Sequence, residues 1–154
     1  MDASQFIGEM RVWTDRDFDF MGWHDATVHG LVFRPQNYSF ALDLDYILKW
    51  VEPEPPESFY SFWVAPATLA FENVSELEIA IQSNLPQLTL FGIERDDERP
   101  VPNGHLKSWR YILDADQGTI TFRATGFTQK FRNLPVFTRQ QSLTEQERGD
   151  FNAY

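Results

Sequence analysis

The residues best placed to do chemistry are His24 and Asp25, which stand side by side just before an apolar run. A carboxylate beside an imidazole can orient the ring, raise its basicity or share a metal ion with it. Neighbours in a regular strand point to opposite faces, so a direct pair needs a turn or a strand start, which Gly22 makes possible. A His-Asp dipeptide is a weak signal by itself. We therefore favour a structural role, in which His24 caps a sheet edge and Asp25 accepts hydrogen bonds from local backbone amides.

A second candidate site is the segment Leu42-Asp43-Leu44-Asp45. In a strand, Asp43 and Asp45 lie on one face, about 7 Å apart. Two such carboxylates can bind a hard cation or divide acid and base roles between them. The chain lacks the Asp-x-Asp-x-Asp-Gly loop that would supply the remaining oxygen ligands of a calcium site. We therefore expect Asp43 and Asp45 to lie on a solvated strand face.

Other catalytic and metal-binding patterns are missing from the sequence. It has no cysteine, no Gly-x-Ser-x-Gly elbow and no glycine-rich phosphate loop, and its three histidines lack the helical spacing of metal ligands. His105 follows Gly104 in a predicted loop, where we expect it to be solvated. The sequence thus predicts no catalytic residue, no metal ligand and no cofactor. An enzyme would need the side chains of His24, Asp25, Asp43 and Asp45 to converge within about 5 Å of a common point.

Length and composition predict one domain spanning residues 1–154, in a cytoplasmic protein. The absence of cysteine excludes disulfides. The first residues, Met1-Asp2-Ala3-Ser4-Gln5, lack a secretory leader, and no run is long and apolar enough to predict a membrane span. An aromatic content of 16% leaves a homodimer possible if some of the rings are exposed.

The net charge of −10 opposes binding to nucleic acids, whose affinity for proteins comes largely from Lys and Arg. Residues 1–77 hold 13 acids and 4 bases, which gives −9, and residues 78–154 hold 10 acids and 9 bases, which gives −1. This acidity serves solubility, and it could also steer a basic protein partner into contact. The candidate acidic binding residues are Asp43, Asp45, Glu52, Glu54 and Glu57.

The hydrophobic pattern alternates with a period of two, which is typical of half-buried strands. Strands are predicted at Val28–Phe33, Tyr38–Trp50, Phe59–Phe71, Leu77–Ile81, Leu88–Glu94, Ser108–Asp114, Ile120–Ala124 and Phe127–Phe131. Short helices are predicted only near Ser4–Val12 and Ser142–Arg148. Strands joined by turns without intervening helices favour a mainly β fold, either an antiparallel β-sandwich or a partly open barrel with one or two short helices.

Three connections between these strands carry further expectations. The segment from Glu52 to Glu57 holds three prolines and three acids and should form an exposed, stiff link. The charged run Glu94–Arg99 should form a hairpin tip. Gly118 should supply a positive φ after the turn that follows Asp114.

Pro66 interrupts a run of apolar and aromatic residues, and we expect the strand to bend there. The aromatic residues of this run are typical of a core, although Tyr60, Phe62 and Trp63 could also floor a ligand pocket or form an interface.

A resemblance rests on three segments, which span roughly residues 20 to 125. They are Trp23-His24-Asp25-Ala26, the run from Leu42 to Trp50 and the run from Phe62 to Phe71. Together they resemble a family of small uncharacterised bacterial β-rich proteins, which is similar in turn to immunity proteins of bacterial toxin systems. Some of those immunity proteins carry a His-Asp-Ala segment that leads into a first strand. The resemblance implies a cytoplasmic protein that binds and blocks a toxin domain, and it supplies no catalytic residues.

Three functions therefore stay open, and they differ in class. The first is a non-catalytic protein-binding module of immunity type, which needs no catalytic motif and could use an acidic surface to meet a basic toxin domain. The second is a small-ligand binder with a cavity between sheets, lined by Trp23, Trp63 or Trp109. The third is a metal-dependent or acid-base enzyme that uses His24, Asp25 and the two aspartates of the Leu-Asp-Leu-Asp segment. We favour the first.

Overall fold

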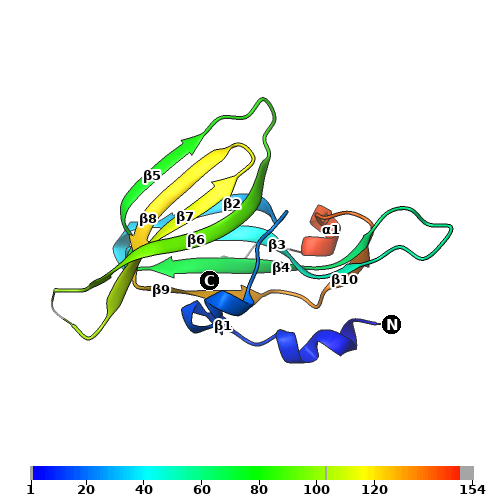
Figure 1. Cartoon of the computed structure of the whole chain (residues 1–154), viewed down its shortest axis with the longest axis horizontal. Coiled ribbons are helices and arrows are strands. Elements are labelled where there is room, and N and C mark those ends of the chain that lie inside the picture. The colour runs from blue at the N-terminus through cyan, green and yellow to red at the C-terminus, as the bar shows by residue number, and fades with distance from the viewer. Residues whose placement is uncertain (1, 103, 150–154) are drawn as a thin grey trace.

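The computed structural model describes residues 2–102 and 104–149 and shows ten strands joined in one antiparallel sheet (Figure 1). The strands are β1 (Trp13–Thr14), β2 (Thr27–Arg34), β3 (Ser39–Val51), β4 (Ser61–Glu72), β5 (Ser75–Ile81), β6 (Leu88–Pro100), β7 (Lys107–Ala115), β8 (Gly118–Ala124), β9 (Gly126–Phe131) and β10 (Val136–Thr138). Their order is β1-β9-β4-β3-β2-β6-β7-β8-β5, and β10 pairs with β4. The predicted mainly β, antiparallel fold is confirmed, and the sheet does not close into a barrel.

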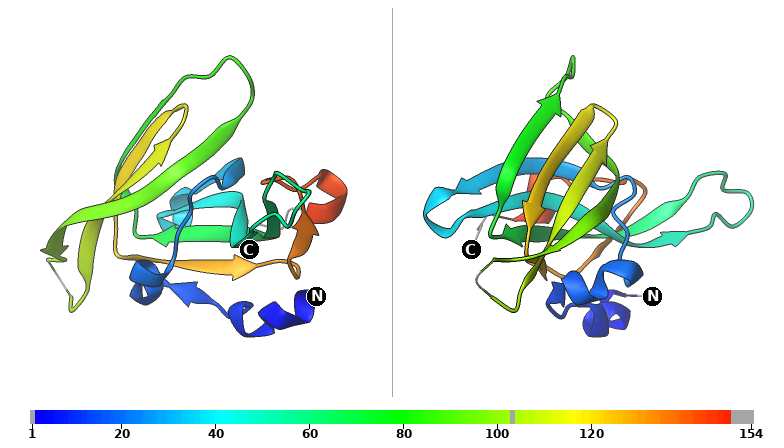
Figure 2. Two further views of the ribbon diagram at one scale, coloured as in Figure 1. Left: turned by 45° about the vertical axis from the view of Figure 1, so that its right-hand side comes forward. Right: turned by 60° about the vertical axis from the view of Figure 1, so that its left-hand side comes forward.

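The sheet folds over on itself at the junction between β2 and β6. These two strands share only the pairs Thr27 with Thr89 and Val28 with Leu88. One half, made of β3, β4 and β9, therefore lies under the other half, made of β5 to β8, and the two views of Figure 2 show the tilt between them. One apolar cluster fills the space between the halves.

Alternation along β3 and β4 separates this core from a polar face. Leu42 lies opposite Leu69 and Leu44 opposite Ala67, and all four side chains are fully buried. Asp43, which points to the other face, lies opposite Thr68. The half of the sheet that contains β3, β4 and β9 is thus apolar toward β5–β8 and polar on its outer face.

The helices are short, as predicted, but their bounds differ from the expectation. They are η1 (Ala3–Glu9), η2 (Asp15–Phe20), η3 (Pro35–Asn37) and α1 (Glu145–Arg148). Thr144 caps α1, with a capping box to Glu147. The expected start at Ser142 is therefore too early by one short turn. No helix within 2–102 and 104–149 has both the length and the apolar character that crossing a membrane requires.

Pro66 leaves β4 continuous but marks a change of neighbour. Val64 pairs with Val136 of β10, and from Ala67 onward β4 pairs with β9. The Pro66 carbonyl accepts a hydrogen bond from the Arg132 amide, 2.9 Å away, on this same edge. In an antiparallel ladder a residue directs its nitrogen and its carbonyl to the same neighbour. The missing N–H of Pro66 therefore falls where one neighbouring strand ends and the next begins.

One predicted boundary is wrong. The run Glu94–Arg99 does not form a hairpin tip, because β6 continues through it to Pro100 and pairs with β7. Cross-strand ion pairs hold this extension, including Arg110 with Asp96 at 2.9 Å and Lys107 with Glu98 at 2.7 Å. Opposite charges facing each other across two strands stabilise the pairing of a segment that has little apolar surface to bury.

Candidate functional site

A buried charge cluster lies on the outer face of β3, where the sequence analysis predicted solvated carboxylates. Its members are His29, Asp43, Asp45, Arg132 and Arg148. Asp45 is 0% exposed and Asp43 only 5% exposed, so the expected solvated face is wrong. The alternation that puts both carboxylates on one face is as predicted, but another part of the chain covers that face.

The cover is the C-terminal segment, residues 139–149, which includes α1. Arg148 places one guanidinium nitrogen on Asp45 and the other on Asp43. The Leu143 amide donates to Asp45 Oδ2 over 2.9 Å, and Arg132 from the end of β9 donates to Asp43 Oδ1 over 2.6 Å. Each buried carboxylate thus receives several charge-assisted hydrogen bonds, which offset the cost of removing it from water.

His29, whose side chain is 31% exposed, lies at the rim of the buried charge cluster, at a bulge in β2. Its Nε2 lies 2.7 Å from Asp45 Oδ2. Burial lowers the pKa of His29, Arg148 and Arg132 lower it further, and Asp43 opposes them. The neutral ring therefore donates its Nε2 proton to Asp45, and Nδ1 carries no proton.

The charge pairing leaves no carboxylate of the cluster open to a cation. Asp43 and Asp45 already accept from guanidinium groups, and no group of three or more acidic or histidine side chains within the described ranges could hold a metal ion. The cluster instead fixes the C-terminal segment on the sheet. Sequence reasoning missed it because Arg132 and Arg148 come 89 and 103 residues after the aspartates they bind.

His24 and Asp25 do form a direct pair, in a turn as the sequence required. Asp25 has φ of 64°, and its Oδ2 lies 3.2 Å from His24 Nδ1. Gln141 of the C-terminal segment donates to the same oxygen over 2.9 Å. Asp25 thus holds the imidazole through Nδ1, while the His24 side chain remains largely exposed.

Around His24 lies an aromatic strip, which consists of Phe91, His24, Trp50 and Tyr60. The His24 ring centroid is 5.4 Å from that of Phe91 and 6.1 Å from that of Trp50, and Trp50 is 6.1 Å from Tyr60. Trp50 is 41% exposed, Tyr60 44% and Phe91 62%. Four rings from β6, the turn before β2, the end of β3 and the loop before β4 therefore form one continuous surface.

The remaining predicted residues fall in three places. Glu52, Glu54 and Glu57 lie in the exposed loop between β3 and β4, next to the aromatic strip, and Arg139 pairs with Glu57 at 3.0 Å. Trp63 is buried and packs on Phe6 and Phe137. His105 lies in the loop between β6 and β7.

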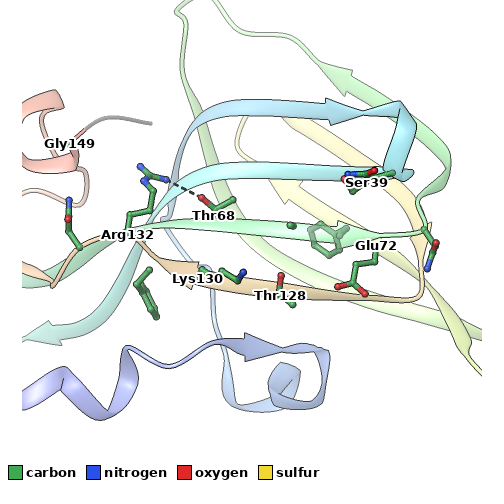
Figure 3. A pocket seen from close by; sticks show the side chains of 13 residues that line it. Ser39, Thr68, Glu72, Thr128, Lys130, Arg132 and Gly149 are labelled. Carbon is green, nitrogen blue, oxygen red and sulfur yellow. Dashed lines mark hydrogen bonds between the residues drawn. The ribbon is translucent and has the colours of Figure 1, made fainter. Parts of the chain in front are cut away.

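A groove of about 840 Å³ lies on the outer face of β3, β4 and β9, and no sequence motif predicted it. Its lining includes Ser39, Thr68, Glu72, Thr128, Lys130 and Arg132 (Figure 3). Gly149, the last described residue of the C-terminal segment, borders the groove. The lining of this groove includes none of Trp23, Trp63 and Trp109, the residues expected to line a cavity between sheets.

Comparison of the chain with protein-family models, with curated proteins and with solved structures finds no match.

Proposed function

We propose that this chain is a non-catalytic protein-binding module whose partner docks on the aromatic strip. The observation that carries the proposal is the continuous exposure of Phe91, His24, Trp50 and Tyr60. Connected exposed rings are unusual on a monomer surface and typical of interfaces, where aromatic side chains supply most of the binding energy.

The charge around the strip selects the chemistry of the partner. Glu52 and Glu54 lie in the loop that runs from Trp50 to Tyr60 and form no ion pair among the described residues, and the whole chain carries −10. A complementary surface has an apolar centre surrounded by Lys and Arg side chains. Toxin domains that act on nucleic acids have basic surfaces of this kind. We therefore propose a basic toxin domain as the partner, with this chain acting as an immunity-type protein.

The rigidity of the surroundings supports a binding role. Asp25 holds the His24 ring, Gln141 holds Asp25, and the buried charge cluster fixes the segment that carries Gln141. A side chain that is already fixed before binding loses little conformational entropy on association. The contact with Asp25 thus restrains the His24 ring within the strip before a partner binds.

The first experiment measures binding of the purified chain to a panel of purified basic toxin nuclease domains by titration calorimetry. With a domain that binds, Tyr60→Ala and Phe91→Ala should each weaken affinity at least about tenfold, as expected for central aromatic contacts. Phe20→Ala, which removes a still more exposed ring from η2, is the control and should change nothing. A tight complex that tolerates both strip substitutions would contradict the proposed interface.

The acidic loop is tested separately by kinetics. Reversing Glu52, Glu54 and Glu57 to Lys should lower the association rate with a basic partner and weaken its salt dependence, and should change the dissociation rate less. Reversal of Glu76, Glu78 and Asp116, which changes net charge equally but lies on β5 and the turn between β7 and β8, is the control. Equal slowing by the two triple variants would mean that only net charge matters and that this loop does not steer the partner.

A further inference from the structure

The groove on β3, β4 and β9 is a separate site from the aromatic strip. Ser39, at one end of the groove, begins β3, and Trp50 lies close to the end of that strand, about 36 Å away along it. We propose that the groove binds a small polyhydroxylated anion, a sugar that carries a carboxylate or a phosphate.

The floor of the groove is a flat area of sheet with short polar side chains. Thr68 lies opposite Lys130, and Ala70 lies opposite Thr128. Because alternate residues share a face, Thr68, Ala70 and Glu72 of β4 line the groove while Leu69 and Phe71 point into the core. Short side chains leave room above the strands, and a volume of about 840 Å³ is within the range of small-molecule sites.

The polar groups of the groove match a ligand with several hydroxyls. Ser39, Thr68 and Thr128 offer hydroxyl groups that both donate and accept, and the Glu72 carboxylate accepts (Figure 3). Thr68 already accepts from Arg132 over 3.3 Å, which leaves its own proton to donate. Hydrogen-bond donors and acceptors on three strands can thus form hydrogen bonds with several hydroxyl groups of one sugar ring.

The cation of the groove matches an acidic group on that ligand. Lys130 is exposed on β9 and forms no ion pair with any residue of 2–102 or 104–149, whereas Arg132 on the same face is already paired with Asp43. Exposed lysine ammonium groups bind carboxylates and phosphates as point charges. The net charge of −10 repels molecules that carry many negative charges. The single lysine among hydroxyl groups therefore favours a ligand that has one acidic group and is otherwise neutral.

The test is a titration of the isotope-labelled chain by two-dimensional NMR with four probes: D-glucuronate, glucose 6-phosphate, glucose and inorganic phosphate. The proposal expects amide shifts confined to β9, the second half of β4 and Ser39 with at least one of the two acidic sugars. Glucose and phosphate should bind at least about tenfold more weakly, since each lacks one half of the recognised chemistry. The stronger of the two acidic sugars identifies carboxylate or phosphate as the acidic group.

Variants at one exposed position separate binding from folding. Lys130→Ala should weaken the acidic sugar at least about tenfold and Lys130→Arg should restore it, because the charge is kept. Lys49→Ala, which removes an exposed lysine at the far end of β3, should have no effect. Any of four results would overturn the proposal. Glucose could bind as tightly as the acidic sugars, or phosphate alone could do so. No probe could cause amide shifts, or the Lys130→Ala variant could bind the acidic sugar fully. None of these results bears on the aromatic strip, so the two proposals fail independently.

Discussion

Replacing Asp45 with Asn removes the negative charge that faces the buried guanidinium of Arg148. Removing one partner of a buried ion pair destabilises a fold by about 3–5 kcal/mol. Because Arg148 keeps its pair with Asp43, we expect a loss of about 3 kcal/mol, the lower end of this range, in the free energy of unfolding measured by urea denaturation. Asp96→Asn is the control, because Asp96 accepts two hydrogen bonds from Arg110 at the surface, where solvent screens the pair. A loss no larger than that of the control would show that the cluster does not hold the fold together.

A second residue-scale prediction concerns pH. Burial and two arginines lower the pKa of His29 in the folded chain, so the unfolded chain binds the proton more readily. The contribution of His29 to stability is therefore complete above the unfolded value of 6.5 and is lost as pH falls below it. His29→Gln keeps a donor toward Asp45 without titrating. Denaturation curves between pH 5 and 8 should show a smaller loss of stability on acidification in this variant, and an unchanged pH dependence would refute the assignment of a neutral ring.

Among the elements, the pairing of β5 with β8 depends on one glycine. Gly118 has φ of 146°, and a Cβ there would lie 2.0 Å from the Ala80 carbonyl oxygen. Gly118→Ala should therefore lower the free energy of unfolding by more than the roughly 1–3 kcal/mol of backbone strain alone. Gly92→Ala, at a β6 position with no atom within 4 Å of the added carbon, is the control and should change stability little. Equal effects of the two substitutions in thermal denaturation would contradict this view of the turn.

The same elements show what the sequence can predict. Seven of the eight predicted strands lie close to their observed bounds, because alternation and turn residues are local signals; the eighth, β6, ends at Pro100 and not at Glu94. β1 and β10 were missed, since strands of two and three residues exist only through their partners β9 and β4. A direct His24–Asp25 pair was expected to need a turn, and the pair does lie in one, but the favoured role of Asp25 was to accept from local backbone amides, whereas its carboxylate accepts from Gln141. The arginine cover of Asp43 and Asp45 was not, because it depends on contacts across about a hundred residues that no local pattern encodes.

In the whole molecule, the two halves of the sheet share a single core, and Phe71 lies at its centre. Its ring centroid is 4.6 Å from Phe122 and 5.0 Å from Tyr111 of the upper half, and 5.5 Å from Phe127 of its own half. Neither half can therefore bury its apolar face without the other. Such a core predicts one cooperative unfolding transition, as expected for a single domain.

Phe71→Ala tests this coupling. The lost ring and the cavity it leaves should lower the free energy of unfolding by about 3–5 kcal/mol, and Phe71→Leu should lose less and keep the chain folded for measurement. Native-state hydrogen exchange should show the amides of Leu42 in β3 and Leu113 in β7 losing protection by the same amount, because both open only in global unfolding. Phe20→Ala, at an exposed ring, should leave both amides unchanged. Loss of protection at Leu42 alone would mean that the two halves unfold separately and that the shared core does not make the chain one cooperative unit.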